Sequence, residues 1–169
     1  MRTPEQRERL AIYASIFVTG AAVLVLEVAA TRILSPYYGN TIYTVSSVLG
    51  VVLAALAIGY RVGGTIADRA PEAKRFFATI LFGGIACALV FGATAIVLPV
   101  GGYFFSLSTG PLIWSLVLFA LPSFLLALLS PLAIAILAKE RGHDGIGTIS
   151  GHAFFWSTAG SITGSFGAG

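Results

Sequence analysis

Glu27 has the clearest chemical potential in this sequence, because it lies in a long apolar stretch between Leu26 and Val28. A charged carboxylate in the middle of a bilayer costs about 2.5–3.5 kcal/mol on insertion scales. We therefore expect Glu27 to face the interior of a helix bundle and to have a partner there. In one interpretation it binds a cation or relays a proton. In the other it is a structural carboxylate, protonated or hydrogen-bonded to another helix.

Arg32 is the other charged residue of the same stretch. At about 100° per residue around a helix it points about 140° away from Glu27, so the two side chains do not share a helix face. We expect Arg32 to extend its guanidinium to the outer membrane interface. Glu27 and Arg32 are thus the candidates for an intramembrane cation, proton or structural site.

A second charged group, Asp68, Arg69, Lys74 and Arg75, follows a Gly63-Gly64 pair. Asp68 is suited to capping a short helix after it and to pairing with a basic residue across the loop. The pattern is similar to the loop between the second and third helices of major facilitator transporters, which latches cytoplasmic helix ends during conformational change. Asp68, Arg69 and Arg75 are therefore candidates for such a latch; the alternative is a solvated loop that only sets topology.

Small residues recur every four positions in the last apolar run. Gly160 and Gly164 form a G-x-x-x-G motif, and Ser157 and Ser161 lie beside it. Small residues at this spacing allow two helices to approach closely in a membrane. The motif predicts tight helix packing, either within one bundle or between subunits.

Motifs for cofactor binding or catalysis are missing from the sequence. It has a single cysteine, Cys87, and two histidines, His143 and His152, too few ligands for a metal cluster. No phosphate-binding loop, dinucleotide fingerprint or catalytic triad is present. We therefore expect no cofactor, no metal and no catalytic residue in this chain, which by itself is not expected to be an enzyme.

The composition excludes a water-soluble globule. Of 169 residues, 57% are hydrophobic and only 10% are charged, whereas soluble domains carry roughly 25% charged residues. The net charge is +3, but the basic residues lie in short segments between apolar runs rather than in a stripe with aromatic residues. This pattern is typical of topology signals and lipid contacts, so we do not expect a nucleic-acid partner.

Long apolar runs predict an all-α protein, a polytopic transmembrane bundle of about five helices. A span needs about 20 apolar residues. Proline residues are expected to end or kink these helices: Ser35-Pro36 ends the first, Pro99 the third, and Pro122 and Pro131 kink the fourth. The five expected helices cover residues 11–34, 43–62, 76–98, 111–137 and 152–169.

The basic residues also predict the orientation. Nine of the ten lie before the first run, from the end of the second run (Arg61) to the start of the third, or between the fourth and fifth; Arg32 is the exception. The positive-inside rule then places the N-terminus in the cytoplasm and the chain in the inner or plasma membrane. The fifth run stops on Gly167-Ala168-Gly169 without a polar flank. We expect a fragment of a longer protein with a sixth helix. A cleaved signal peptide is disfavoured, because the first run is too long and Glu27 interrupts it.

Several segments in the same order resemble one family, the N-terminal membrane region of spermidine synthase-like (polyamine aminopropyltransferase) membrane proteins. The resemblance covers nearly the whole chain. The segments that carry it are Gly20-Ala21-Ala22-Val23-Leu24-Val25-Leu26-Glu27, Thr31-Arg32, Ser35-Pro36-Tyr37-Tyr38-Gly39-Asn40, Ser46-Ser47, Gly59-Tyr60, Gly63-Gly64, Ala67-Asp68-Arg69, Ser130-Pro131-Leu132-Ala133 and Ser157-Thr158-Ala159-Gly160-Ser161.

This resemblance implies six or more helices, distantly like half of a major facilitator, often followed by a cytoplasmic aminopropyltransferase domain. That domain, which transfers an aminopropyl group to putrescine, is absent from this sequence, so none of its catalytic residues can be assigned here. The resemblance implies a membrane module that serves as an anchor or as a path for an amine, with Glu27 as the cation contact.

Two other functions fit the sequence. One is a small transporter or half-transporter that works as a homo-oligomer, so that two units enclose a path. The other is a non-catalytic accessory subunit of a larger membrane complex, docked through the small-residue face of the fifth helix. The bilayer is a partner in every case.

Overall fold

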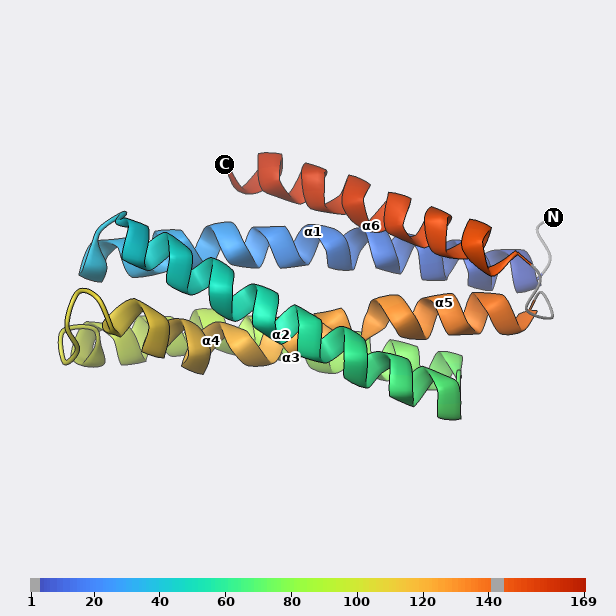
Figure 1. Ribbon diagram of the computed structural model, residues 1–169, viewed down its shortest axis with the longest axis horizontal. Helices are drawn as coiled ribbons and strands as arrows, with labels where there is room; N and C mark the ends of the chain where they lie inside the picture. The colour runs from blue at the N-terminus through green and yellow to red at the C-terminus, as the bar shows by residue number, and fades with distance from the viewer. Residues whose placement is uncertain (1–3, 141–144) are drawn as a thin grey trace.

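The computed structural model describes residues 4–140 and 145–169, and these residues form helices without any strand. The helices lie nearly along one long axis and make an elongated bundle (Figure 1). The predicted all-α class is therefore confirmed. In chain order the helices are α1 (Pro4–Tyr38), α2 (Ile42–Arg69), α3 (Ala73–Gly101), α4 (Gly110–Ala127), α5 (Leu129–Glu140) and α6 (Ile146–Ala168).

The fourth expected helix, residues 111–137, is two helices rather than one kinked helix. α4 ends at Ala127, α5 begins at Leu129, and Leu128 forms a turn between them. Pro131 explains the position of this break, because it cannot donate to the carbonyl of Ala127 and its ring crowds that carbonyl. Pro122 remains inside α4, where the helix continues through it. The two helices are nearly collinear and together act as one long segment (Figure 1).

The predicted helix ends at residues 34 and 98, before Ser35-Pro36 and Pro99, are wrong by four and three residues. α1 continues through Pro36 to Tyr38, and the turn comes at Gly39, whose φ is 72°. Tyr38 is only 2% exposed, so burial of its ring favours the additional helical residues. α3 likewise continues through Pro99 to Gly101. A proline near a helix end removes only one of the last hydrogen bonds, and tertiary packing offsets that loss.

The helices pack as two pairs, α1 with α6 and α2 with α4, and α4 connects the pairs because it also contacts α1. α6 lies along α1, while α2 lies along α4, and α4 also contacts α1 and α3. Figure 1 shows α6 on the outside of the bundle, next to α1. Buried side chains form one apolar cluster around α5 and the start of α1, and a second around the end of α1 and the start of α4. The core of the described residues is therefore divided into two clusters, one toward each end of the bundle.

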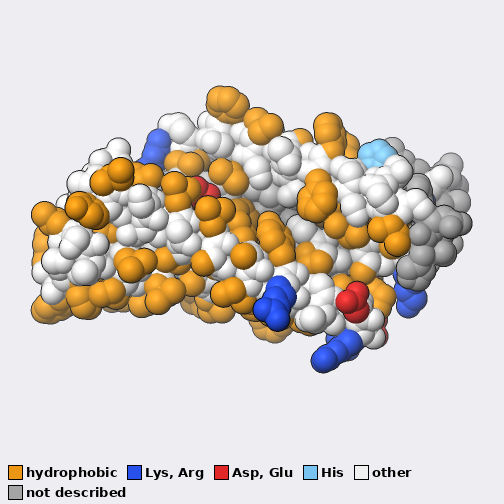
Figure 2. Space-filling view, viewed as in Figure 1, with side chains coloured by type: hydrophobic (Ala, Val, Ile, Leu, Met, Phe, Trp, Pro, Cys, Tyr) orange, Lys and Arg blue, Asp and Glu red, His pale blue; other side chains and the backbone are white. Residues whose placement is uncertain are grey.

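Apolar side chains cover the outside of the bundle as well as its core. Among the many exposed ones, Ile96 is 74% exposed, Phe104 77% and Phe166 84%. In the space-filling view hydrophobic side chains extend over most of the visible face (Figure 2). An apolar surface of this extent requires lipid rather than water.

Four segments are long and apolar enough to cross a membrane: Gln6–Tyr38, Ile42–Arg69, Ala73–Gly101 and Gly110–Lys139. α6, the fifth expected span, is long enough but less apolar, because it is rich in Gly, Ser and Thr. The chain is thus a membrane protein with four strongly apolar spans and a fifth, more polar helix packed against the first.

Two glycines of α2 hold it against the break between α4 and α5. A Cβ atom at Gly59 would lie 2.5 Å from the Cβ of Ala127 and 2.7 Å from the carbonyl oxygen of Phe124. One turn later, a Cβ at Gly63 would lie 2.7 Å from the Pro131 ring and 2.9 Å from the carbonyl oxygen of Leu128. Backbone atoms cannot yield as a flexible side chain can, so α2 can approach this closely only with glycine at both positions.

This contact predicts opposite effects for two chemically identical substitutions in α2. Gly59→Ala should destabilise the protein by about 1–3 kcal/mol, because the new methyl group overpacks a backbone contact. Gly50→Ala, where a Cβ would meet nothing within 4 Å, should be neutral or stabilising by up to about 1 kcal/mol through helix propensity. Thermal unfolding of both variants in detergent measures the difference. Equal midpoints for the two variants would show that the close approach at Gly59 is not a stability determinant.

Candidate functional site

Glu27 lies on α1 within the first span and is half-buried. Its backbone carbonyl accepts a hydrogen bond of 3.3 Å from the hydroxyl of Thr31. Its carboxylate makes no hydrogen bond and no ion pair with any described residue. The expectation that Glu27 is an interior residue with a partner on another helix is therefore not met within the described part of the chain. The carboxylate is left to be protonated or to meet a ligand.

The position of Glu27 on α1 follows from the residues that contact α6. Gly20 is two turns earlier and therefore nearly in line with Glu27, and a Cβ at Gly20 would fall on the carbonyl oxygen of Ser157. Leu26 and Ala30, in contrast, are buried in the core cluster at the end of α1. Glu27 thus lies at the edge between the face of α1 that packs against α6 and the face that packs into the bundle.

Arg32 bonds to the end of α6 rather than to Glu27. Its side chain is exposed, and Nη2 donates a hydrogen bond of 2.8 Å to the carbonyl oxygen of Gly169. A guanidinium at the carboxyl end of a helix is favoured by the partial negative charge of the terminal carbonyl groups. The predicted pair of site residues is therefore split: Glu27 is unpaired and Arg32 ties α1 to α6.

The residues of the expected cytoplasmic latch do not come together. α2 continues well past residue 62, so Asp68 and Arg69 lie in its last turn rather than in a loop, and no short helix follows them. Arg75, in the first turn of α3, forms an exposed ion pair with Glu72, with Nε and Oε2 3.7 Å apart. Such a pair contributes only about 0–1 kcal/mol. Asp68 caps no helix and pairs with no described residue.

The small-residue motif of α6 packs within the same chain, against α1. A Cβ at Gly160 would fall on the carbonyl oxygen of Phe17, and a Cβ at Gly164 would meet the backbone of Ala21. The hydroxyl of Ser161 donates a hydrogen bond of 3.1 Å to the carbonyl oxygen of Gly20. Gly160 meets Phe17 and, one turn later, Gly164 meets Ala21, so the contacts progress in the same direction along both helices. α1 and α6 are therefore parallel neighbours, as Figure 1 also shows.

Ser157 was expected in this seam from the sequence, whereas Phe17 and Trp156 were not. Ser157 contributes its backbone, whose carbonyl oxygen lies against Gly20. The rings of Phe17 and Trp156 meet edge to face with centroids 6.3 Å apart. The adjacent small residues Gly20 and Ala21 were visible in the sequence, but nothing in a single sequence says which of several small-residue faces will meet.

The polar groups buried in α4 were also missed from the sequence. Ser115 and Ser123 are fully buried, and their hydroxyl groups have no hydrogen-bond partner among the described residues. The same holds for the Tyr38 hydroxyl and for Nε1 of Trp114, both at the end of the bundle where α1 finishes. An unpaired buried polar group costs about 1–3 kcal/mol. The sequence did offer a signal for the two buried hydroxyl groups, because each serine lies in a run of mostly apolar residues.

No group of three or more His, Cys, Asp or Glu side chains that could hold a metal ion occurs among the described residues. His143 and Asp144 lie outside them. No protein family, curated protein or solved structure matches this chain. The resemblance to the spermidine synthase-like membrane proteins therefore stays a prediction.

The seam between α1 and α6 can be tested by cross-linking. In a Cys87→Ser background, cysteines replacing Leu24 and Ser165, which line one shallow groove between the two helices, should form an intramolecular cross-link. Gly160→Leu should lower its yield several-fold, because the side chain would collide with the backbone of α1. Gly167→Leu, at a position where a Cβ would meet nothing within 4 Å, is the matched control.

Gel electrophoresis separates the outcomes of that experiment. A cross-linked product that migrates as a monomer is expected. A product that migrates as a dimer would instead assign the motif to contacts between subunits. Equal yields for Gly160→Leu and Gly167→Leu would contradict the packing role of Gly160.

Proposed function

We propose that this chain is an integral membrane module that binds a small organic amine through Glu27. The observation that supports this proposal is the half-buried carboxylate of Glu27, which lies in an apolar span without a partner among the described residues. Because an unpaired charge is costly at this depth, neutralising it with a cation is favourable. The amine is also what the resemblance to spermidine synthase-like membrane proteins implies.

The surroundings of Glu27 suit an alkylammonium ion better than a metal ion. A divalent metal needs several oxygen, nitrogen or sulfur ligands, and Glu27 belongs to no group of three or more His, Cys, Asp or Glu side chains among the described residues. An alkylammonium group needs one carboxylate for its charge and an apolar wall for its methylene groups. Leu24 and Val28 flank Glu27 on the same side of α1 and offer such a wall.

Anchoring is the simplest part of the proposed function, because it requires only apolar membrane spans and no binding residue. Four apolar spans are sufficient to hold an attached catalytic domain at a membrane. The small transporter has no observation in its favour beyond Glu27 itself. The accessory-subunit alternative relied on the small-residue face of α6, and that face is occupied by α1. We therefore prefer an amine-binding anchor module to both.

Amine binding predicts a specific loss in Glu27→Gln. With protein in lipid nanodiscs, putrescine binding by calorimetry should weaken at least about tenfold, because the amide cannot form the charge-assisted hydrogen bond that a carboxylate offers. Glu72→Gln, at an exposed site in the connection between α2 and α3, should bind like the wild type. The uncharged diol of the same chain length should bind to neither. Wild-type protein that fails to bind putrescine, or Glu27→Gln that binds it equally well, would leave anchoring as the only role.

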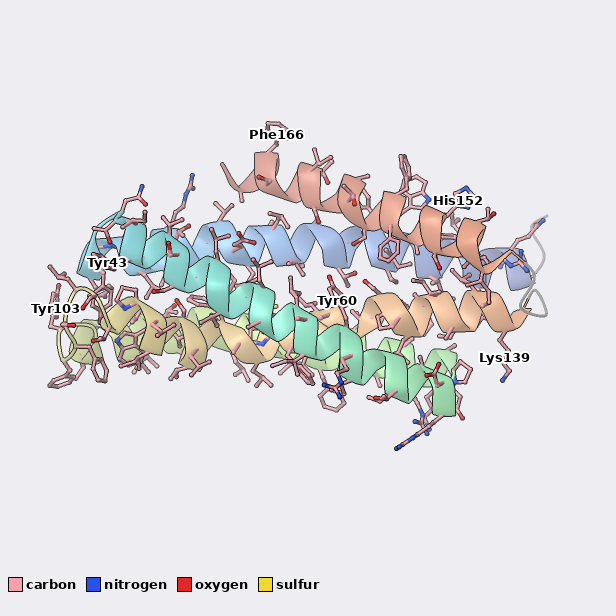
Figure 3. All side chains as sticks on the ribbon, viewed as in Figure 1. Tyr43, Tyr60, Tyr103, Lys139, His152 and Phe166 are labelled. Atoms are coloured by element: carbon pink, nitrogen blue, oxygen red, sulfur yellow. The ribbon has the colours of Figure 1, made fainter. Side chains whose placement is uncertain are left out.

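We further propose that the N-terminus lies in the cytoplasm and that the chain resides in the inner or plasma membrane. Basic side chains support this orientation: apart from Arg32 and Arg61, those described lie where α1 begins, α2 ends, α3 begins and α5 ends, and Arg61 lies about two turns before the end of α2. Figure 3 labels Lys139 and His152 toward one end of the bundle and Tyr43 and Tyr103 at the other. Basic residues favour the cytoplasmic side, and tyrosines are enriched at interfaces.

Labelling of single cysteines tests this orientation. In a Cys87→Ser background, Ser108→Cys, between α3 and α4, should react with an impermeant maleimide in intact cells. Lys74→Cys, at the start of α3, should react only after lysis. Both positions are exposed, so access to the reagent depends on the side of the membrane. The reverse labelling pattern would place the N-terminus outside.

A further inference from the structure

The outer third of α1 borders an open, partly polar hollow of about 510 Å³. Figure 1 shows that α6 diverges from α1 toward Gly169. Glu27 is not among the residues that line the hollow. Its walls are formed by Val28, Thr31, Arg32, Ser35, Pro36 and Asn40.

Hydrogen-bond donors in this hollow are available to a ligand. The hydrogen bond from Nη2 of Arg32 to Gly169 orients the guanidinium but uses only one of its five N–H groups. The side chains of Ser35 and Asn40 form no hydrogen bond with any described residue. Thr31 is different, because its hydroxyl already donates to the carbonyl oxygen of Val28 at 2.7 Å. The free donors therefore come from Arg32, Ser35 and Asn40, and no acidic side chain lines the hollow.

The depth of the hollow matches the headgroup region of a bilayer. Arg32 lies six residues before the end of α1 at Tyr38, which is about 9 Å along a helix. At that end the rings of Tyr37 and Tyr103 meet edge to face with centroids 5.4 Å apart, and Tyr103 is 73% exposed. Exposed tyrosines are typical of the interface between lipid and water. The backbone of Arg32 lies one to two turns deeper, and its long side chain can extend the guanidinium back to the lipid phosphate and glycerol groups.

We infer that this hollow is a binding site for the phosphate group of a membrane phospholipid, held by Arg32 with Ser35 and Asn40. A guanidinium can donate two parallel hydrogen bonds to phosphate oxygens, and hydroxyl and amide donors complete the contact. Val28 and Pro36 provide apolar walls for the glycerol and the start of the acyl chains. The lipid belongs to the leaflet opposite the basic end of the bundle. Glu27 does not line the hollow, so the site does not require amine binding there, although Val28 borders both.

Arg32 also differs from every other described basic residue, because it alone lies at this end of the bundle. The remaining basic residues attract anionic lipids by charge at the opposite interface, without a shared hollow. A lipid site at Arg32 therefore predicts an effect of this one residue that an equal loss of charge elsewhere does not reproduce.

Native mass spectrometry of the detergent-solubilised chain, titrated with phosphatidylglycerol, tests the inference. Arg32→Gln should weaken the tightest lipid-binding event about tenfold, which corresponds to about 1.4 kcal/mol. Arg61→Gln removes one exposed charge from α2, about two turns before the end of that helix, and should leave that event unchanged. Ser35→Ala keeps the charge and the bond from Arg32 to Gly169, so it is less disruptive to folding, and it should weaken the same event several-fold.

Two further probes identify the source of the phosphate. An uncharged diacylglycerol should bind equally to the wild type and to Arg32→Gln, since it offers no phosphate. Inorganic phosphate at millimolar concentration should not displace the phospholipid; displacement would overturn the lipid assignment in favour of a small soluble phosphate. The site would be overturned if Arg32→Gln and Arg61→Gln weakened the tightest lipid-binding event equally. It would also be overturned if neither Ser35→Ala nor Arg32→Gln weakened that event.

Discussion

The packing of this bundle depends on close approach of helix backbones. Lipid chains are as apolar as leucine, so burying leucine against leucine gains little when both sides already face lipid, and van der Waals contact between helices has to supply the stability. Gly160 and Gly164 bring α6 onto the backbone of α1, and Gly59 and Gly63 bring α2 onto the break between α4 and α5. Both contacts join a glycine face to carbonyl oxygens, which no larger side chain would allow. The two helix pairs that dominate the fold are the two that have such a contact.

In the same apolar surroundings, the few polar groups in the spans need a hydrogen-bond partner. Thr19, Thr31 and Thr94 return their hydroxyl hydrogens to carbonyl oxygens of the preceding turn of their own helix, which satisfies them locally. Ser115, Ser123 and the carboxylate of Glu27 have no such partner among the described residues. Serines in a packed core can be tolerated at a modest cost, but a carboxylate cannot remain charged there without a partner. Glu27 is therefore the carboxylate in the interior of the described spans whose state depends on something outside the described fold.

Hydropathy and proline patterns were sufficient to predict the helices but not their ends or their neighbours. The spans follow from the apolar runs, since any long apolar segment in a membrane has to satisfy its backbone as a helix. The ends of α1 and α3 could not be predicted, because burial of residues such as Tyr38 outweighs the local preference of a proline. The break at Leu128 depends on Pro131 three residues later, whereas Pro122 leaves α4 intact. Both prolines carry the same local signal, and only tertiary packing separates them.

Site prediction was limited by the same absence of long-range information. The spacing of Glu27 and Arg32 correctly separated their side chains, but it could not reveal that Arg32 reaches the end of α6. The packing role of Gly160 was readable from its spacing, and its partner Gly20 was not. Asp68, Arg69 and Arg75 matched a loop pattern that the extension of α2 removes.

The parallel seam between α1 and α6 joins segments that are synthesised far apart in time. The hydrogen bond from Ser161 to Gly20 spans 141 positions in the chain. Because α1 precedes α6 in the chain, its small-residue face enters the membrane before its partner is synthesised. α6 has no stretch as apolar as those of the other long helices described, so the glycine face of α1 gives it a packing partner that lipid alone does not offer. The first helix thus acts as a template on which α6 is retained.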